Sequence, residues 1–226
     1  MASGEFRLRV RYRKDGRLRW LSHLETCRAL ERAVRRSRLP YAVTRGFSPH
    51  MKLAFGPALP VGTAGSAELL DLLLVSYVPA AEAVVRLRAA SAEGLAIEET
   101  RYVEAGLPSL AASLTIAVYD VRVEGVVADR MKQALDRVRR DGRLTIEHKG
   151  KHKVYDLARS LPKEPRVEGI EDGVAIEVAV RMGPEGSLRP EALVEAALAS
   201  TDADGAVMSV SRTDLLEEAE GAWRRP

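Results

Sequence analysis

Residues 6–13, FRLRVRYR, alternate strictly between large apolar or aromatic side chains and arginines. A period of two residues places the two sets on opposite faces of a β-strand. One face of this strand must therefore join a hydrophobic core, and we expect the other face to be open. The first face carries Phe6, Leu8, Val10 and Tyr12, and the second carries Arg7, Arg9, Arg11 and Arg13.

The residues after this strand predict a short hairpin and a helix. Asp15 and Gly16 are typical of a tight turn, after which Leu18 and Trp20 continue the alternation as a hairpin partner. A helix is expected from Leu24 to about Ser37, ahead of a proline. Further strands are expected over 41–44, 52–55, 67–78 and 95–103, and a helix over 80–92; the first half of 67–78 is also compatible with a helix.

The second half of the chain repeats this order of elements. It predicts strands over 113–123, 174–181 and 206–211, helices over 126–140 and 190–199, and a hairpin of 143–148 with 153–157. Each half thus has the β-α-β-β-α-β order of a ferredoxin-like domain with extra β-hairpins, in which helices cover one face of an antiparallel sheet. We expect an α+β protein of two tandem ferredoxin-like domains, residues 1–106 and 107–226, joined by a linker containing glycine and proline over 104–112.

Charge is distributed unevenly along the chain. Residues 1–56 carry 14 Lys and Arg against 4 Asp and Glu, a balance of +10, whereas residues 57–226 carry 21 against 28, a balance of −7. Most of the basic residues in the first part are arginines, whose planar guanidinium suits phosphate contacts and stacking on bases. They alternate with core positions and form no tail, which favours nucleic acid over a membrane as the polyanion partner.

The helix expected at 24–37 separates basic from apolar side chains. At about 100° per residue its arginines form one stripe, and Leu24, Cys27, Leu30 and Val34 form another. The alternative is that the arginines of strand and helix only keep these surfaces solvated. We favour phosphate binding, because few acidic residues interrupt the basic ones. The predicted nucleic-acid-binding residues are Arg7, Arg9, Arg11, Arg13, Arg28, Arg32, Arg35, Arg36, Arg45, His50 and Lys52.

Two short segments contain the candidate catalytic residues. In SHLE, Ser22 and Glu25 fit a capping box, and His23 fits a packed histidine or, if it lines a cleft, a general base. In GFSPHMK, residues 46–52, Gly46 and Pro49 are typical of a turn, which leaves His50 without a structural task. His23 and His50 are therefore the catalytic candidates, although we expect a non-catalytic protein.

Several classes of site are not expected. Cys27 is the single cysteine, so an internal disulfide, an iron–sulfur cluster and a structural zinc site are excluded. His23 and Cys27 have helical spacing, but no second pair of ligands accompanies them, so we expect neither a metal nor a cofactor. The first residues resemble no signal peptide and no segment is long enough to span a bilayer, so we expect a cytoplasmic protein without a membrane partner.

The chain resembles the bacterial radical-SAM-linked family of uncharacterised proteins. The resemblance covers the whole length, and its specific part lies between residues 6 and 75. That part contains the strand at 6–13, KDGRLRWLSHLE, RALERAVRRSRLPYAVTRGFSPHMKLAFGPALPVG and SAELLDL. The family pattern usually has aspartate where this chain has Glu25 and proline where it has Met51. The resemblance implies a role in RNA modification or processing, with tRNA or rRNA and a radical-SAM protein or an E/G-type ribonuclease as partners. The three clustered cysteines of a radical-SAM enzyme are absent from this sequence.

Three hypotheses follow for the function. The leading one is an RNA-binding accessory protein that holds phosphates through its arginine-rich N-terminal surface. The second is a metal-independent endoribonuclease that uses His23 or His50 as general acid or base. The third is a protein-interaction module that docks a radical-SAM enzyme, through the more acidic second half.

Overall fold

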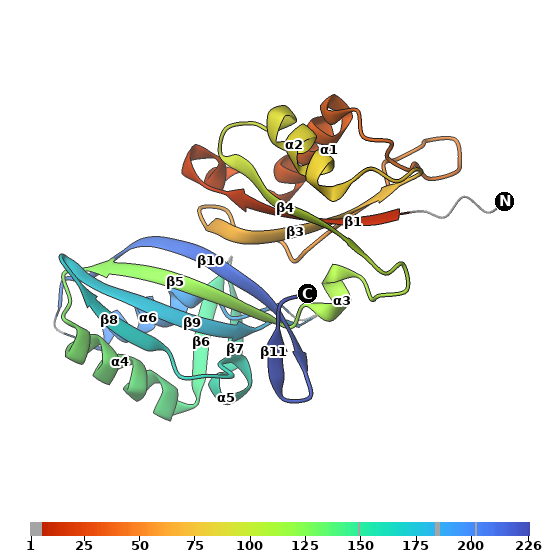
Figure 1. Cartoon of the computed structure of the whole chain (residues 1–226). Coiled ribbons are helices and arrows are strands. Elements are labelled where there is room, and N and C mark those ends of the chain that lie inside the picture. Colours follow the sequence, from red (N-terminus) through yellow and green to blue (C-terminus); the bar gives the residue numbers. More distant parts are fainter. Residues whose placement is uncertain (1–5, 149, 184–185, 202) are drawn as a thin grey trace. The chain divides into compact units, whose positions relative to one another are not determined.

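The structure is a computed structural model that describes residues 6–148, 150–183, 186–201 and 203–226. Its fold is α+β, as the sequence predicts, and the chain divides into two compact units, Met1–Leu114 and Thr115–Pro226 (Figure 1). Each unit contains an antiparallel sheet with helices. No helix within the described ranges is long and apolar enough to cross a membrane.

The first unit has three long strands, one short strand and two main helices. Its strands form an antiparallel sheet in the order β4-β1-β3, and β2 pairs with the other edge of β3. The elements are β1 (Phe6–Lys14), η1 (Gly16–Trp20), α1 (His23–Ser37), β2 (Leu53–Phe55), β3 (Ala64–Leu74), α2 (Ala80–Ala90), β4 (Leu95–Val103) and α3 (Leu110–Ser113).

The core of this unit lies between the sheet and its two main helices. Phe6 at the start of β1 is exposed, although the alternation predicts it on the inward face. Leu8, Val10 and Tyr12 are buried, which confirms that face at the other three positions. They pack with Leu70, Leu72 and Leu74 of β3, with Leu30 and Val34 of α1, and with Ala83 and Leu87 of α2. Figure 1 shows α1 and α2 on the same face of this sheet.

The predicted hairpin partner of β1 is wrong. Residues 16–20 form the 3₁₀ helix η1, with Gly16 at a φ of +55°. The reason lies in the sheet, because β1 pairs with β3 on one side and with β4 on the other. No edge of β1 remains for residues 18–20. The buried Lys14 side chain, at the end of β1, donates a hydrogen bond of 2.8 Å to the carbonyl of Leu21, which follows η1.

Helix α1 buries a stripe slightly different from the predicted one. Leu30 and Val34 are buried as expected, but Leu24 is 58% exposed and Cys27 is half-buried. The buried stripe instead begins at Thr26, and Leu24 lies about 160° from Thr26 around the helix axis, on nearly the opposite side.

Of the two strands expected over 41–44 and 52–55, only the second forms a regular strand beside β3. Residues 41–44 contribute only isolated bridges, between Tyr41 and Leu74 and between Val43 and Met51. Segment 52–55 supplies β2, which pairs with β3. Because β3 is a strand from Ala64 to Leu74, the helical alternative for the first half of 67–78 is excluded.

The second unit has its own antiparallel sheet in the order β10-β5-β9-β8, with β11 paired to β10 and a separate hairpin of β6 and β7. Its elements are β5 (Ile116–Glu124), α4 (Ala128–Asp141), β6 (Arg143–His148), β7 (Lys151–Asp156), α5 (Leu157–Ser160), β8 (Arg166–Ile170), β9 (Gly173–Arg181), α6 (Pro190–Ala199), β10 (Ala206–Ala219) and β11 (Ala222–Arg224).

The sequence predicts most of these elements but misses β8, β11 and the second half of β10. Strand β8 is largely exposed, so it lacks the alternation of a half-buried strand. In β10 the pairing register shifts at 207–209 and again at 212–214. Such irregularities change which face a side chain occupies, and the period of two is lost beyond Ser211.

Candidate nucleic-acid interface

Helix α1 presents its arginines to solvent, as predicted. Arg28, Arg32, Arg35 and Arg36 are all exposed. The Arg35 guanidinium lies 3.6 Å from the carboxylate of Glu31, and Arg36 donates two hydrogen bonds, of 3.0 and 2.5 Å, to the carbonyl of Ala90 in α2. Neither Arg28 nor Arg32 is paired with a carboxylate at contact distance within the described residues, and Arg28 attracts the Glu25 carboxylate from farther away and helps to lower its pKa. They are therefore the residues of α1 best placed to meet an external anion.

Two arginines of β1 have an internal role instead. The Nε atom of Arg7 is 2.9 Å from Asp71 Oδ2, and the Nε atom of Arg9 is 2.8 Å from Asp71 Oδ1. Only 3% of Arg9 is exposed. The expectation that every arginine of β1 lies on an open face is therefore wrong for Arg9. The cause is the register, which sets Arg9 directly opposite Asp71 of β3.

The remaining arginines of β1 are more accessible. Arg13 is exposed, with its Nε atom 2.9 Å from Asp15 and 3.8 Å from Glu98, so carboxylates already offset its charge. Arg11 is half-buried and lies opposite Leu69 of β3 and Glu99 of β4. The accessible positive charge of this unit thus lies mainly on α1 and the loops, and less on β1 than the sequence indicates.

The loop over 44–50 projects from the edge of the sheet. Gly46 has a φ of +135°, as predicted for its turn. The Thr44 N–H donates to the His50 carbonyl at 2.8 Å, and the His50 N–H donates to Thr44 Oγ1 at 2.9 Å, which closes the loop. The side chains of Arg45 and His50 are exposed. Lys52 lies at the base of the loop and is half-buried.

The predicted contact residues of this loop leave out one exposed aromatic side chain. Phe47 is fully exposed at its tip, between Gly46 and Ser48. An aromatic residue in a turn flanked by glycine and proline was the available signal, since such a position is rarely part of a core. Phe47 adds a flat apolar surface next to Arg45.

The start of α1 is a capping box, as predicted. Ser22 Oγ accepts a hydrogen bond of 3.3 Å from the Glu25 N–H, and the Glu25 carboxylate accepts one of 2.8 Å from the Ser22 N–H. The Ser22 hydroxyl also donates to this carboxylate at 2.7 Å. These bonds, first from the side chain and then from the backbone of Ser22, lower the pKa of Glu25 below its usual value.

We expect the substitution Ser22→Ala to lower the free energy of unfolding by about 1 kcal/mol, because the Glu25 N–H loses the hydroxyl that accepts its hydrogen bond and the Glu25 carboxylate loses one of its two donors from Ser22. Urea unfolding measures this change. Ser22→Thr keeps the hydroxyl and serves as the control. If the alanine variant and the native protein were equally stable, the Ser22 side chain would contribute nothing measurable to the free energy of unfolding, contrary to this prediction.

The two candidate histidines lie on different elements. His23 packs edge-on against the Phe55 ring at 5.9 Å between centroids, and its Nε2 atom is 3.5 Å from Cys27 Sγ. It is nevertheless an exposed residue at the helix start and not a core histidine. A small cavity that His23 lines together with Lys14 and Glu68 does not include His50. A catalytic role would therefore rest on one histidine or the other.

Cys27 has the character of an ordinary thiol. Burial, followed by the charge of Glu31, raises the pKa of Cys27. The thiolate, which is the form that binds metals or attacks an electrophile, is therefore disfavoured. Among the described residues no group of three His, Cys, Asp or Glu side chains is placed to hold a metal ion.

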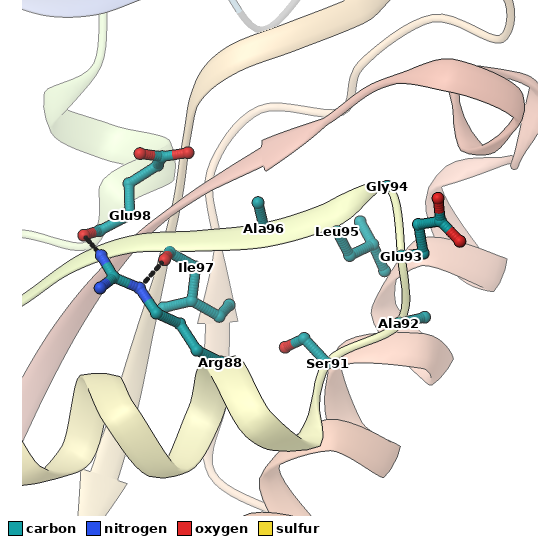
Figure 2. Close-up of a pocket in the computed structure, with 9 residues that line it drawn as sticks. All are labelled: Arg88, Ser91, Ala92, Glu93, Gly94, Leu95, Ala96, Ile97 and Glu98. Carbon is teal, nitrogen blue, oxygen red and sulfur yellow. Dashed lines mark hydrogen bonds between the residues drawn. The ribbon is translucent and has the colours of Figure 1, made fainter.

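A hollow between α2 and β4 is unsuited to phosphate. Figure 2 shows the Arg88 side chain reaching from α2 to the backbone of β4, where it donates to the carbonyls of Ile97 at 2.6 Å and Glu98 at 2.5 Å. The Arg88 guanidinium thus already donates hydrogen bonds to the protein's own backbone. The carboxylates of Glu93 and Glu98 border the same hollow and would repel an anion.

Comparisons with known proteins give a family and a fold likeness. A search of curated proteins found no match. One chain in a solved structure, described as "Crystal Structure of a Cbf5-Nop10-Gar1 Complex", is similar with a TM-score of 0.50 at 14% identity, over 92% of this chain and 48% of that chain. This chain spans about half the length of that one, and the likeness concerns the fold alone. A family model matches residues 7–190, and the chain belongs to the family described as "Uncharacterized protein conserved in bacteria (DUF2344)".

Proposed function

We propose that this protein binds RNA without catalysis and holds its phosphates through α1 and the loop over 44–50. The observation that carries the proposal is the exposure of Arg28 and Arg32 one helical turn apart, with no ion pair to other described residues. Residues four apart on a helix face the same side, so both guanidinium groups can meet one phosphate strand. Arg35, Arg45, His50 and Lys52 are included in the proposed surface. Arg11 and Arg13 alternate with the core residues of β1 and so lie on the face of the sheet away from α1.

RNA is the favoured polyanion for two reasons. Arginine binds phosphate with a planar fork and also stacks on unpaired bases, which single-stranded RNA offers. The exposed Phe47 beside Arg45 supplies a further surface of the kind on which bases stack. Arg7 and Arg9 are left out of the binding surface, because both are engaged by Asp71.

The proposed setting is the modification or processing of RNA, with tRNA or rRNA as the ligand. A radical-SAM protein or an E/G-type ribonuclease is the proposed partner. Both proposals, the RNA setting and the protein partner, rest on the resemblance whose specific part lies between residues 6 and 75. The family description supports a bacterial protein and names no activity.

We also propose that each unit is a ferredoxin-like domain. Support comes from the element order β1-α1-β2-β3-α2-β4, which is matched by β5-α4-β8-β9-α6-β10 in the second unit. In both units the fourth strand of this series lies beside the first, and the third lies between the first and the second. The hairpin of β6 and β7 is then an insertion. The boundary proposed after residue 106 falls in the loop between β4 and α3.

Affinity for a short single-stranded RNA, measured across a salt series, tests the function. With about four phosphate contacts, affinity should fall roughly fiftyfold between about 50 and 200 mM salt, because bound phosphates release counterions. Fluorescence anisotropy of a labelled oligonucleotide gives the slope directly. Absence of binding at the lowest salt, or an affinity independent of salt, would rule the proposal out.

A further inference from the structure

A basic hollow of about 490 Å³ lies in the second unit. It is lined by the last residues of β7, by α5 and by the end of β9 with residues that follow it. We call it the β7–α5 hollow. The polar and aromatic side chains of its described lining that the argument uses are those of Lys153, Tyr155, Asp156, Arg159 and Arg181. Three of these are cations and one is an anion, so the hollow favours a negatively charged ligand.

The hairpin of β6 and β7 brings a cation and an aromatic ring to this hollow. Lys153 and Tyr155 are two residues apart in β7 and therefore lie on one face of the strand. Across the hairpin they pair with Ile146 and Leu144, which are half-buried. Lys153 is exposed, and its ammonium lies 4.8 Å from the centroid of the Tyr155 ring. The hairpin thus presents a positive charge and a flat ring side by side.

The two arginines of the hollow differ in how far their charge is offset. Arg181 donates hydrogen bonds to both carboxylate oxygens of Glu218, one of them at 3.1 Å, so its charge is largely neutralised. Arg159 is exposed, and its guanidinium is paired with no carboxylate in the described ranges of the chain. The Asp156 carboxylate accepts a hydrogen bond of 3.1 Å from the Arg159 N–H at the start of α5. The accessible positive charge therefore comes mainly from Lys153 and Arg159.

The sequence concentrates positive charge around this hollow. Residues 143–159 carry 5 Lys and Arg against 2 Asp and Glu, whereas residues 115–142 and 160–226 together carry 13 against 19. The segment of β6, β7 and α5 is therefore basic within an otherwise acidic unit. A distribution that only keeps a surface solvated would intersperse both signs, as the rest of this unit does.

We propose that the β7–α5 hollow is a second phosphate-binding site for single-stranded RNA, separate from α1 and the loop over 44–50. The class of ligand rests on the proposed function. Arg159 can grip one phosphate with its planar fork, and Lys153 can neutralise a neighbouring phosphate as a point charge. Tyr155 adds a ring of the kind on which an unpaired base stacks. Because two cations of the hollow are accessible and α1 with its loop offers more, the hollow is the weaker of the two sites.

The test starts from the full-length variant that carries Arg28→Glu and Arg32→Glu. The RNA binding that remains in it at about 50 mM salt should come from the hollow, and adding Lys153→Glu and Arg159→Glu should weaken it at least about tenfold, because phosphate contacts become repulsions. Fluorescence anisotropy of a labelled single-stranded oligonucleotide measures both affinities.

A matched control is the addition of Arg130→Glu and Arg137→Glu to the same starting variant. These substitutions lie on α4 of the same unit and change the net charge equally. They should leave the remaining affinity nearly unchanged. All of the substituted positions except Lys153 and Arg159 lie outside the hollow, and a thermal melt establishes that each variant remains folded.

The outcomes separate this inference from the proposed function. If the starting variant binds no RNA, or if the two further reversals weaken it equally, the hollow is not a site and the α1 surface stands. If reversing Arg28 and Arg32 has no effect while reversing Lys153 and Arg159 in the native protein abolishes binding, the α1 surface is wrong and the hollow stands. A free mononucleotide that displaces the RNA from the starting variant at equal concentration would overturn the assignment to an RNA strand.

Discussion

Reversing Arg28 and Arg32 to glutamate together is expected to weaken RNA binding roughly a hundredfold at about 0.1 M salt, because two phosphate contacts become two repulsions. The slope of affinity against salt should fall by about two units in the same variant. This effect is larger than that of any loop substitution, since the two side chains are exposed one turn apart and their charge is not offset by an ion pair within the described residues.

A matched control for this variant exists in the second unit. Arg130 and Arg137 are exposed on α4, which is an amphipathic helix of similar length to α1. Their double reversal to glutamate makes the same change in net charge. If the two double variants lose affinity equally, the effect comes from overall charge and the assignment of α1 is wrong. Circular dichroism and a thermal melt establish that both proteins remain folded.

The second large effect is expected for stability. Replacing Asp71 with alanine should lower the stability of the first unit by about 3–5 kcal/mol, because two guanidinium groups lose the carboxylate that they share in a buried setting. The side chains of Arg9 and Asp71 are only 4% and 2% exposed in this pair, and that of Arg7 is 10% exposed. Amide hydrogen exchange of β1 and β3 reports the loss within the unit, and urea unfolding measures its size.

The control for this prediction is a second aspartate that pairs with an arginine of the same strand. Asp15 lies 2.9 Å from Arg13, but both side chains are largely accessible to water. Asp15→Ala should therefore cost no more than about 1 kcal/mol. A loss in Asp71→Ala that does not exceed this value would show that water or nearby groups solvate Arg7 and Arg9 adequately without the carboxylate.

Local sequence patterns predicted most helices and strands of this fold. They did not predict which strands, far apart in the sequence, pair with each other. The inward face of β1 and the capping box at Ser22 were correct, because each depends on residues only two or three positions apart. The hairpin expected at Leu18 and Trp20 failed, because both edges of β1 are taken by strands that lie far away in sequence.

In the candidate site, too, features that depend on nearby residues were predicted, and features that depend on distant residues were not. Exposure of the α1 arginines follows from helical spacing and was predicted correctly. Arg9 is buried in a pair with Asp71, which lies 62 residues away in the sequence. A local sequence pattern does not show which residues of two distant strands face each other. The ring contacts among Phe6, Tyr77 and Tyr102 could not be predicted for the same reason, since these residues meet only after β1, β3 and β4 have paired.

The contacts of Arg7 have a consequence for how the first unit ends. Besides Asp71, this side chain donates hydrogen bonds to the carbonyls of Leu107 at 2.6 Å and Pro108 at 2.9 Å. Strand β1 is thereby hydrogen-bonded to the backbone segment that follows β4. A fragment that stops at residue 106 lacks both acceptors and leaves the guanidinium partly unpaired. We therefore expect the smallest autonomous form of this unit to extend at least through Pro108, and Arg7, predicted from the sequence as a nucleic-acid-binding residue, instead links the beginning of the unit to its end.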